Sequence, residues 1–328
     1  MPDPDGGAAP AAGSSMDGVG LAELRMRRLR AAAAGTAAAP PLFKGPTYFA
    51  CTVDGGDRWE RAVPIYDPGV NALTTNNIIR VLPTVPTLVE DYFVHIHSNG
   101  SAFINLIFSI NSGLTWSKSP IVVTDLQYAP VVTPFAHEQV RASGIIFSVT
   151  DDPATAAVYV VWLDDRFTRG VNAIAFSQSL DFGATWSAPI RVNQTPASTT
   201  HPRLGEAFIR WVAVALDGTI TVTYYDFRNN TGGAGVEQTD YFAVFCHPAT
   251  SDCGKAGSWG HEVRLTDTSF NMLDAPRTFG PGVASGRFVG DYMGLVSTGR
   301  GVWPVFGVAN APNKTNLYTR RITLPTSP

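Results

Sequence analysis

The octapeptide Ser179–Trp186, S-L-D-F-G-A-T-W, decides the fold because the chain repeats it. Thr52–Trp59 reads T-V-D-G-G-D-R-W, and Ser109–Trp116 reads S-I-N-S-G-L-T-W. A looser copy, T-S-D-C-G-K-A-G-S-W, runs over Thr250–Trp259 with two inserted residues. Repetition of this kind indicates one supersecondary unit that is used several times.

The composition of the octapeptide predicts a hairpin turn. An Asp at its third position accepts hydrogen bonds from backbone N–H groups, and a Gly two residues later adopts positive φ without a Cβ clash. In the second copy Asn111 replaces Asp, which keeps the acceptor oxygen and loses the charge. We therefore interpret the repeat as a structural turn and not as a source of catalytic carboxylates.

The octapeptide resembles the Asp box, or BNR repeat, of sialidases (neuraminidases) and related β-propellers. Each copy is followed by a short β-type run, such as W-S-A-P-I-R-V after Ala184-Thr185. The boxes and their flanking runs cover most of the chain from about Thr47 to Ile322. The resemblance implies a propeller whose blades each carry a box between their third and fourth strands.

The remaining sequence also predicts an all-β domain of many short strands. Gly and Pro are plentiful, at 31 and 24 of 328 residues, and helical periodicity is almost absent. Val158–Leu163 and Thr219–Tyr225 are apolar on nearly both faces, as expected of strands sandwiched between neighbouring blades. At ~40–50 residues per blade, residues 45–328 predict about six blades.

The N-terminal blade is expected to be incomplete. Only two strand-like runs, T-Y-F-A-C and R-A-V-P-I-Y, flank its box. Residues 1–44 before it are rich in Ala, Gly and Pro and carry a basic patch that includes Arg27 and Arg28, so we expect a disordered extension. A signal peptide that begins at Met26 is the alternative. Localisation is therefore left open, with a secreted or extracytoplasmic site among the options.

Composition narrows the choice of partners. The net charge of −3 gives no basic field for nucleic acid or an anionic membrane, and no apolar run approaches the ~20 residues of a membrane helix. No zinc spacing is present, and neither metal nor cofactor is expected. Cys246 and Cys253 are close enough in sequence for a local disulfide, which leaves Cys51 in a strand, buried and inert. We expect a monomer.

Candidate functional residues gather on the face opposite the boxes, where second strands lead to third strands. Two of these connections carry matching pentamers, W-L-D-D-R at residues 162–166 and Y-Y-D-F-R at residues 224–228. Asp164 with Arg166, and Asp226 with Arg228, fit two interpretations. They are either ion pairs that brace loops or an anion-binding and acid/base set.

The connections between blades add further candidates on the same face. T-H-P-R brings His201 and Arg203, and G-R-F-V-G-D-Y-M-G-L brings Arg287, Asp291 and Tyr292. Guanidinium groups bind a carboxylate with two parallel hydrogen bonds. Several arginines on one face therefore predict a site for an acidic ligand.

The resemblance to sialidases implies a role for each of these residues. Sialidases hold the sugar carboxylate with three arginines and use a Tyr nucleophile, activated by a Glu, with an Asp as acid/base. Carried over by position, Arg166, Arg228 and Arg287 form the triad and Tyr292 is the nucleophile. Asp226 or Asp164 is then the acid/base residue, with Arg203, His201 and Asp291 as further substrate contacts. Glu206 and Glu237 are candidates to activate the Tyr.

Three functions remain open at the level of sequence. The first is a sialidase-like glycoside hydrolase that acts on terminal acidic sugars of glycans. The R-I-P motif of sialidases is absent, and Arg80 in I-I-R-V-L-P only approaches it. A non-catalytic propeller that binds glycan or protein is therefore an alternative, and so is a different polysaccharide-active enzyme on the same fold.

Overall fold

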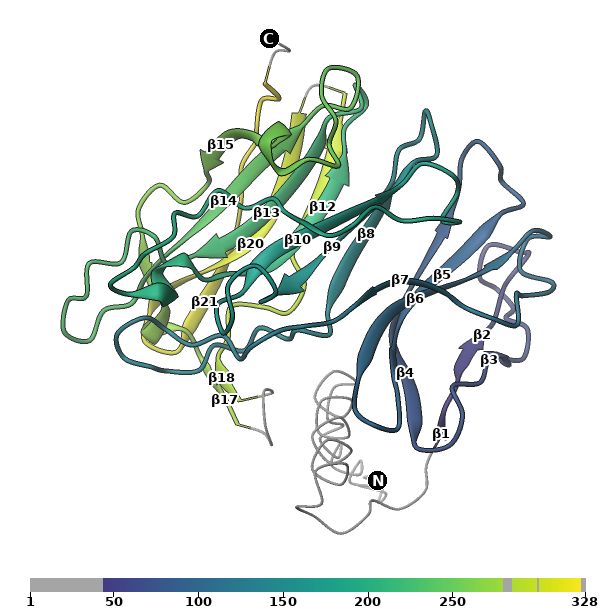
Figure 1. Ribbon diagram of the computed structural model, residues 1–328, viewed down its shortest axis with the longest axis horizontal. Helices are drawn as coiled ribbons and strands as arrows, with labels where there is room; N and C mark the ends of the chain where they lie inside the picture. Colours follow the sequence, from purple (N-terminus) through teal and green to yellow (C-terminus); the bar gives the residue numbers. More distant parts are fainter. Residues whose placement is uncertain (1–43, 280–284, 300, 326–328) are drawn as a thin grey trace, which may run out of the picture.

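Four sheets, antiparallel apart from one short parallel pair, make up most of the molecule (Figure 1). The computed structural model describes residues 44–279, 285–299 and 301–325. Residues 1–43, which hold nearly all of the expected N-terminal extension, lie outside the described part. The described elements are strands and three short 3₁₀ turns, η1 (Pro202–Gly205), η2 (Ala256–Ser258) and η3 (Met272–Asp274). The prediction of an all-β fold is confirmed.

The four sheets take their strands in chain order. The first sheet contains β1 (Lys44–Gly45), β4 (Ala72–Val81), β5 (Val89–Ile96), β6 (Ala102–Ser109) and β7 (Ile121–Asp125). The second contains β8 (Phe147–Asp151), β9 (Val158–Asp164), β10 (Ala173–Ser179) and β11 (Ile190–Arg191). The third contains β12 (Ala207–Val214), β13 (Ile220–Asp226), β14 (Gln238–Cys246) and β15 (Gly260–Arg264), with β16 (Phe270–Asn271) paired to β14. The fourth contains β19 (Gly294–Thr298), β20 (Gly301–Ala311) and β21 (Lys314–Thr319).

Two small ribbons complete the described fold. β2 (Thr47–Phe49) pairs with β3 (Val63–Tyr66) on either side of the first box, so the N-terminal unit has the two strands expected from its sequence. β17 (Arg277–Thr278) pairs with β18 (Gly286–Arg287) before the fourth sheet. Only β1 pairs in parallel, with β4, among the named strands.

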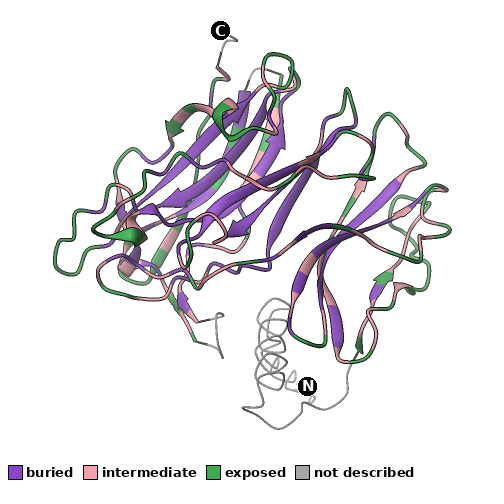
Figure 2. Ribbon diagram, viewed as in Figure 1, coloured by how far each residue is buried: buried purple, intermediate pink, exposed green. Residues whose placement is uncertain are grey.

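The sheets stack on one another through alternating faces of their strands. β9 is buried along its whole length (Figure 2). Its Val158, Val160 and Trp162 pack into a core shared with the first sheet, whereas Tyr159 and Val161 pack into a core shared with the third and fourth sheets. Since successive side chains of a strand point to opposite faces, the second sheet is sandwiched between its neighbours.

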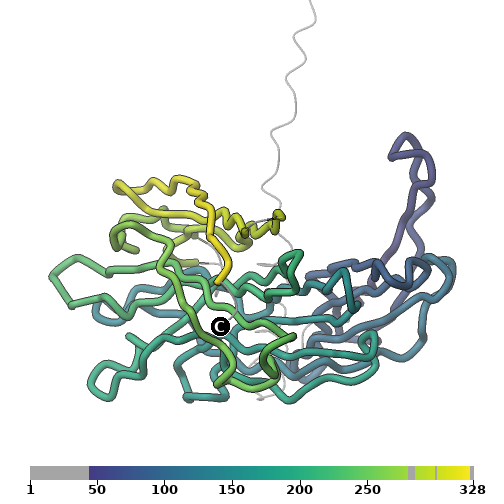
Figure 3. The backbone as a smooth tube through the Cα atoms, turned by 90° about the horizontal axis from the view of Figure 1, so that it is seen from above, coloured from purple at the N-terminus to yellow at the C-terminus, as the bar shows by residue number. Residues whose placement is uncertain are grey.

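One strand of each sheet lies on the inner side of this stack. β4 contacts β8, β8 contacts β12, and β12 contacts β19. From above, the sheets succeed one another from β2 and β3 at one end to the fourth sheet at the other (Figure 3). Residues on inner strands, and in the segments that lead to them, are therefore brought together from distant parts of the sequence.

The repeated octapeptides form the turns that their sequence predicts. In the third copy Asp181 Oδ1 accepts from Thr185 N at 2.8 Å, and Ser179 Oγ accepts from Gly183 N at 2.8 Å. The second copy makes the matching bonds through Asn111, with Thr115 N at 2.9 Å. Gly183 has φ 77°, which a residue with Cβ rarely adopts. Asn serves as well as Asp here, as expected of a structural acceptor.

We expect Asp181→Ala to lower the free energy of unfolding by about 1 kcal/mol, because the N–H and hydroxyl of Thr185 lose their acceptor. Urea unfolding measures the change. Asp181→Asn is the matched control and should be nearly neutral, since Asn111 fills the same position in the second copy. An equal loss in both variants would contradict the acceptor role.

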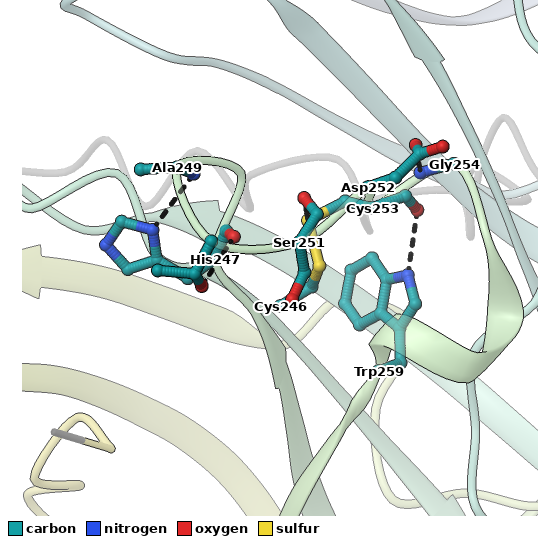
Figure 4. Close-up of a disulfide and its surroundings, with 9 residues drawn as sticks. Cys246, His247, Ala249, Ser251, Asp252, Cys253, Gly254 and Trp259 are labelled. Carbon is teal, nitrogen blue, oxygen red and sulfur yellow. Dashed lines mark hydrogen bonds between the residues drawn. A yellow bond between two sulfur atoms is a disulfide. The ribbon is translucent and has the colours of Figure 1, made fainter. Parts of the chain in front are cut away.

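The fourth copy is closed by a disulfide between Cys246 and Cys253 (Figure 4). Trp259 Nε1 donates to the carbonyl of Cys253 at 3.0 Å, so the tryptophan of this copy is tied to the bridge. The local disulfide that the spacing of Cys246 and Cys253 allowed is thus present. The expectation for Cys51 was wrong, because β2 ends at Phe49 and Cys51 is half-buried in the connection that follows.

Candidate functional site

The W-L-D-D-R pentamer ends β9 with a buried ion-pair cluster. Asp164 is fully buried and accepts from Trp162 Nε1 at 2.6 Å and from Arg166 Nε at 2.7 Å. The other side of the Arg166 guanidinium donates to Asp125 Oδ1 at 2.9 Å. Burial raises the pKa of Asp164, although the hydrogen bonds from Arg166 and Trp162 act to lower it. Because Asp125 belongs to β7, the cluster joins the second sheet to the first.

The Y-Y-D-F-R pentamer ends β13 in the same way. Asp226 is fully buried, accepts from Arg228 Nε at 2.6 Å and accepts from Thr195 Oγ1 at 2.7 Å. Arg228 also pairs with Glu262 of β15 and lies over the ring of Phe242 at 3.9 Å. Burial raises the pKa of Asp226 to about 6.

These contacts match the bracing interpretation of the pentamers. Arg166 and Arg228 each have carboxylates on two sides of the guanidinium, and they lie in two separate clusters. The structure does not bring them into one ion-pair cluster with Arg287. Sequence reasoning also missed Glu262 and Tyr224, which complete the second cluster through a hydrogen bond from the Tyr224 hydroxyl to Glu262.

The two glutamates considered as activators of a Tyr brace connecting segments. Glu206 is fully buried and accepts from Asn172 N at 3.1 Å and from Arg203 Nη1 at 3.3 Å. Burial raises the pKa of Glu206 to about 8. Glu237 accepts from the backbone N–H groups of Phe135 and Ala136.

His201 and Arg203 lie in the same connection between β11 and β12 as Glu206. The ring of His201 packs on Phe135 with 4.9 Å between centroids. Arg203 therefore has a carboxylate partner within its own connection, and His201 has an aromatic one.

The G-R-F-V-G-D-Y segment lies at the inner strands. Arg141 Nε and Nη2 donate to the two carboxylate oxygens of Asp291, at 3.1 and 2.5 Å. Arg287 N donates to Gln139 O, and Arg141 N donates to Arg287 O, each at 2.8 Å. Two connections that are far apart in sequence thus bring Arg141, Arg287 and Asp291 together.

Tyr292 follows Asp291 directly and is 54% exposed. Its hydroxyl faces Asn76 Oδ1 of β4 at 3.5 Å, and its ring meets Trp211 of β12 edge to face. Asn76 has φ 56° and donates from Nδ2 to Ile145 O at 2.7 Å, which fixes its amide. Tyr292 is therefore an accessible phenol between inner strands of two sheets.

Arg210 is a residue that sequence reasoning missed. It lies on β12 and is only 2% exposed, and among the described residues its Nε and Nη2 have no hydrogen-bond partner. Nη1 reaches Ser143 O at 3.5 Å. Burial lowers the pKa of its guanidinium to about 9, although the nearby Tyr292 and Asp291 act in the opposite direction. An arginine inside the apolar run A-F-I-R-W-V-A-V was the available signal.

We call Arg141, Arg210, Arg287, Asp291 and Tyr292 the axial cluster. It presents three guanidinium groups and one accessible phenol; Arg141 binds the carboxylate of Asp291, and Arg287 Nε lies 3.7 Å from a carboxylate oxygen of Glu138. Buried cations without partners are costly unless an anion joins them. The arrangement suits an acidic ligand that enters beside Tyr292.

The described part of the chain contains neither a metal-binding group of side chains nor a helix that could span a membrane. Residues 44–279, 285–299 and 301–325 contain no group of three or more His, Cys, Asp or Glu that is arranged to hold a metal ion. The same residues include no helix of the length and apolarity that crossing a bilayer requires.

Comparison with known proteins assigns no family. No family model matches the chain, and no curated protein matches it. Among solved structures, an intramolecular trans-sialidase of leech is 12% identical at a TM-score of 0.42, over 84% of this chain and 36% of that one. The intramolecular trans-sialidase of Ruminococcus gnavus is 10% identical at 0.43, over 84% and 50%.

An endo-arabinase from Bacteroides thetaiotaomicron is 11% identical at a TM-score of 0.41, over 75% of this chain and 74% of that one. This chain spans half or less of the length of the two sialidases. With TM-scores below 0.5, these likenesses decide neither the family nor the activity.

Proposed function

We propose that this chain is a carbohydrate-active Asp-box propeller, and that its activity is that of a sialidase-like glycoside hydrolase. It acts, as a monomer, on terminal acidic sugars of glycans. Three octapeptide turns with the same acceptor geometry support the propeller. The described residues form four sheets and two short ribbons, and the count of six blades remains part of this proposal.

The observation that carries the activity is the buried guanidinium of Arg210 near Tyr292, whose Nε and Nη2 have no hydrogen-bond partner among the described residues. A substrate carboxylate would supply the missing acceptors for its Nε and Nη2, with Arg287 as a second cation. Charge-assisted pairs of this kind are strong in buried sites. The acidic sugar is thus recognised by the group that the free protein leaves unsatisfied.

The same placement supports roles in catalysis. Tyr292 would attack the anomeric carbon, as the Tyr of sialidases does, and give its hydroxyl proton to the neighbouring carboxylate of Asp291, which passes it to the departing oxygen as the glycosidic bond breaks. Asp291 is adjacent in sequence, and Arg141 positions it. Asp164 and Asp226 already pair with Arg166 and Arg228 at strand ends, which supports a bracing role for both in place of acid/base chemistry.

A non-catalytic glycan-binding propeller is the second candidate. Two observations favour it: Arg166 and Arg228 are already paired, and the hydroxyl of Tyr292 faces an amide oxygen. In that case the axial cluster would bind the acidic sugar without cleaving it.

The test is release of a fluorophore from an aryl α-sialoside. We expect the wild-type protein to turn it over and Tyr292→Phe to abolish turnover while leaving the thermal midpoint unchanged. Arg210→Lys keeps the charge and loses the paired donors, so we expect kcat/KM to fall by about 100-fold, or about 2.7 kcal/mol.

Arg166→Lys is the matched control, because Arg166 lies in a bracing cluster. Its effect on kcat/KM of the folded protein should stay within a few-fold. Calorimetry with 3′-sialyllactose separates the two candidates. Binding that depends on Arg210, without any turnover by the wild type, would establish the non-catalytic function. Neither turnover nor binding would overturn both.

A further inference from the structure

A cleft of about 520 Å³ lies beside the axial cluster. Its walls are Pro276, the segment Phe288–Gly290 and the turn-strand segment Asn313–Leu317, where β20 turns into β21. Gly290 is two residues from Tyr292, so their Cα atoms lie within about 7 Å. The cleft is therefore lined by the same chain segment that carries Tyr292.

The walls of this cleft are fixed to one another in the free protein. Thr315 Oγ1 donates to the carbonyl of Phe288 at 3.2 Å. A Cβ at Gly307 would lie 2.2 Å from Val289 O, so the two backbones touch and only Gly fits there. The cleft is preformed, which lowers the cost of binding.

The cleft has an apolar wall and a polar rim. Pro276, Phe288 and Leu317 supply apolar surface. Arg141 of the axial cluster lies over the Phe288 ring at 4.7 Å, so this wall contacts the cluster. The rim carries the side chains of Asn313, Lys314 and Asn316, which are exposed. Within the described residues these three side chains make no hydrogen bond or ion pair.

This combination is the chemistry that binds a sugar ring. A pyranose presents C–H groups on its faces and hydroxyls at its edge, and ligand sites pair apolar walls with a few polar groups in the same manner. Two amides and an ammonium supply both donors and acceptors. A flat apolar ligand would leave these three polar groups unused.

We infer that the cleft binds the sugar unit to which the terminal acidic residue is attached, and that this unit is a neutral hexose. The inference rests on the proposed function, since it takes Tyr292 as the point of cleavage. It makes this chain specific for oligosaccharides over small aryl glycosides. Lys314 and Asn316 determine that preference.

The test compares two substrates that share the acidic sugar: an aryl α-sialoside, and 3′-sialyllactose with its neutral disaccharide. For the double variant Lys314→Ala/Asn316→Ala we expect kcat/KM to fall about tenfold on 3′-sialyllactose, chiefly through KM. The value on the aryl glycoside should stay within twofold. Lys118→Ala, at an exposed lysine two residues after the second box, is the matched control.

The possible outcomes distinguish a failure of the cleft inference from a failure of the proposed function. Equal effects of the double variant on both substrates, or no effect on either, would overturn the inference and leave the hydrolase intact. If the wild type hydrolyses neither substrate, calorimetry with 3′-sialyllactose and with lactose takes over. Tenfold weaker binding of both in the double variant supports the cleft, and absence of wild-type binding to either sugar overturns it.

Discussion

Replacing Asp226 with Ala is expected to lower the free energy of unfolding by about 3 kcal/mol or more. The carboxylate is fully buried and neutralises Arg228, which is mostly buried as well. Removal of one member of such a pair leaves the other charge uncompensated, and typical losses are ~3–5 kcal/mol. Thr195 Oγ1 loses its acceptor in the same step. Urea unfolding, followed by circular dichroism, measures the change.

Two matched variants test the physical reason for that loss. Asp164→Ala breaks the corresponding cluster at the end of β9 and should cost a similar amount. Asp267→Ala breaks an ion pair with Arg320 in which Asp267 is 95% exposed, so its effect should lie within experimental error. A loss below 1 kcal/mol for Asp226→Ala would show that Glu262 alone compensates Arg228.

The turns could be predicted from sequence because their hydrogen bonds are local. Every bond that ties Asp181 to the turn comes from a residue at most four positions away, so the octapeptide contains its own explanation. β9 and β13 were equally clear, since both are apolar along their length and are buried throughout.

β4 could not be predicted in the same way. Its sequence, A-L-T-T-N-N-I-I-R-V, has polar residues in the middle, and Asn76 adopts φ 56°. The strand exists because it pairs with β5 on both sides of an irregularity between Thr75 and Ile78. That pairing is a property of the first sheet, and nothing within the strand itself indicates it.

Only part of the candidate site could be predicted from the sequence, because the contacts that complete it are non-local. The pentamers identified Arg166 and Arg228 at strand ends, but the carboxylates that pair with them, Asp125 and Glu262, come from other strands 41 and 34 residues away. Arg210 lies where the pairing of β12 with β13 shifts register, between Phe208 and Trp211, so the strand pattern alone could not predict its orientation. Non-local contacts therefore decide which arginines are paired with carboxylates and leave Nε and Nη2 of Arg210 without a hydrogen-bond partner among the described residues.

The stability of the chain should fall as pH rises from 6 to 8. Burial raises the pKa of Glu206 to about 8, and burial raises those of Glu90 and Asp91 to about 7. A carboxyl whose folded pKa exceeds its unfolded value stabilises the fold below the unfolded pKa and loses that contribution as pH rises through the folded pKa. With about 1.4 kcal/mol for each pKa difference of one, we expect a loss of about 3 kcal/mol or more between pH 6 and pH 8.

His95 acts at the other end of the pH range. Burial lowers its pKa to about 4, so the contribution of His95 alone is lost as pH falls from about 6.5 towards 4. The three buried carboxyls together outweigh this single histidine, so urea unfolding at pH 5, 6, 7 and 8 should show the highest free energy of unfolding at pH 5 and a fall at each step above it. Glu206→Gln should flatten the curve above pH 6, since the amide cannot ionise, whereas Asp267→Asn at an exposed position should not. A free energy of unfolding that is constant or rises from pH 6 to pH 8 would mean that these buried carboxyls do not control stability in this range.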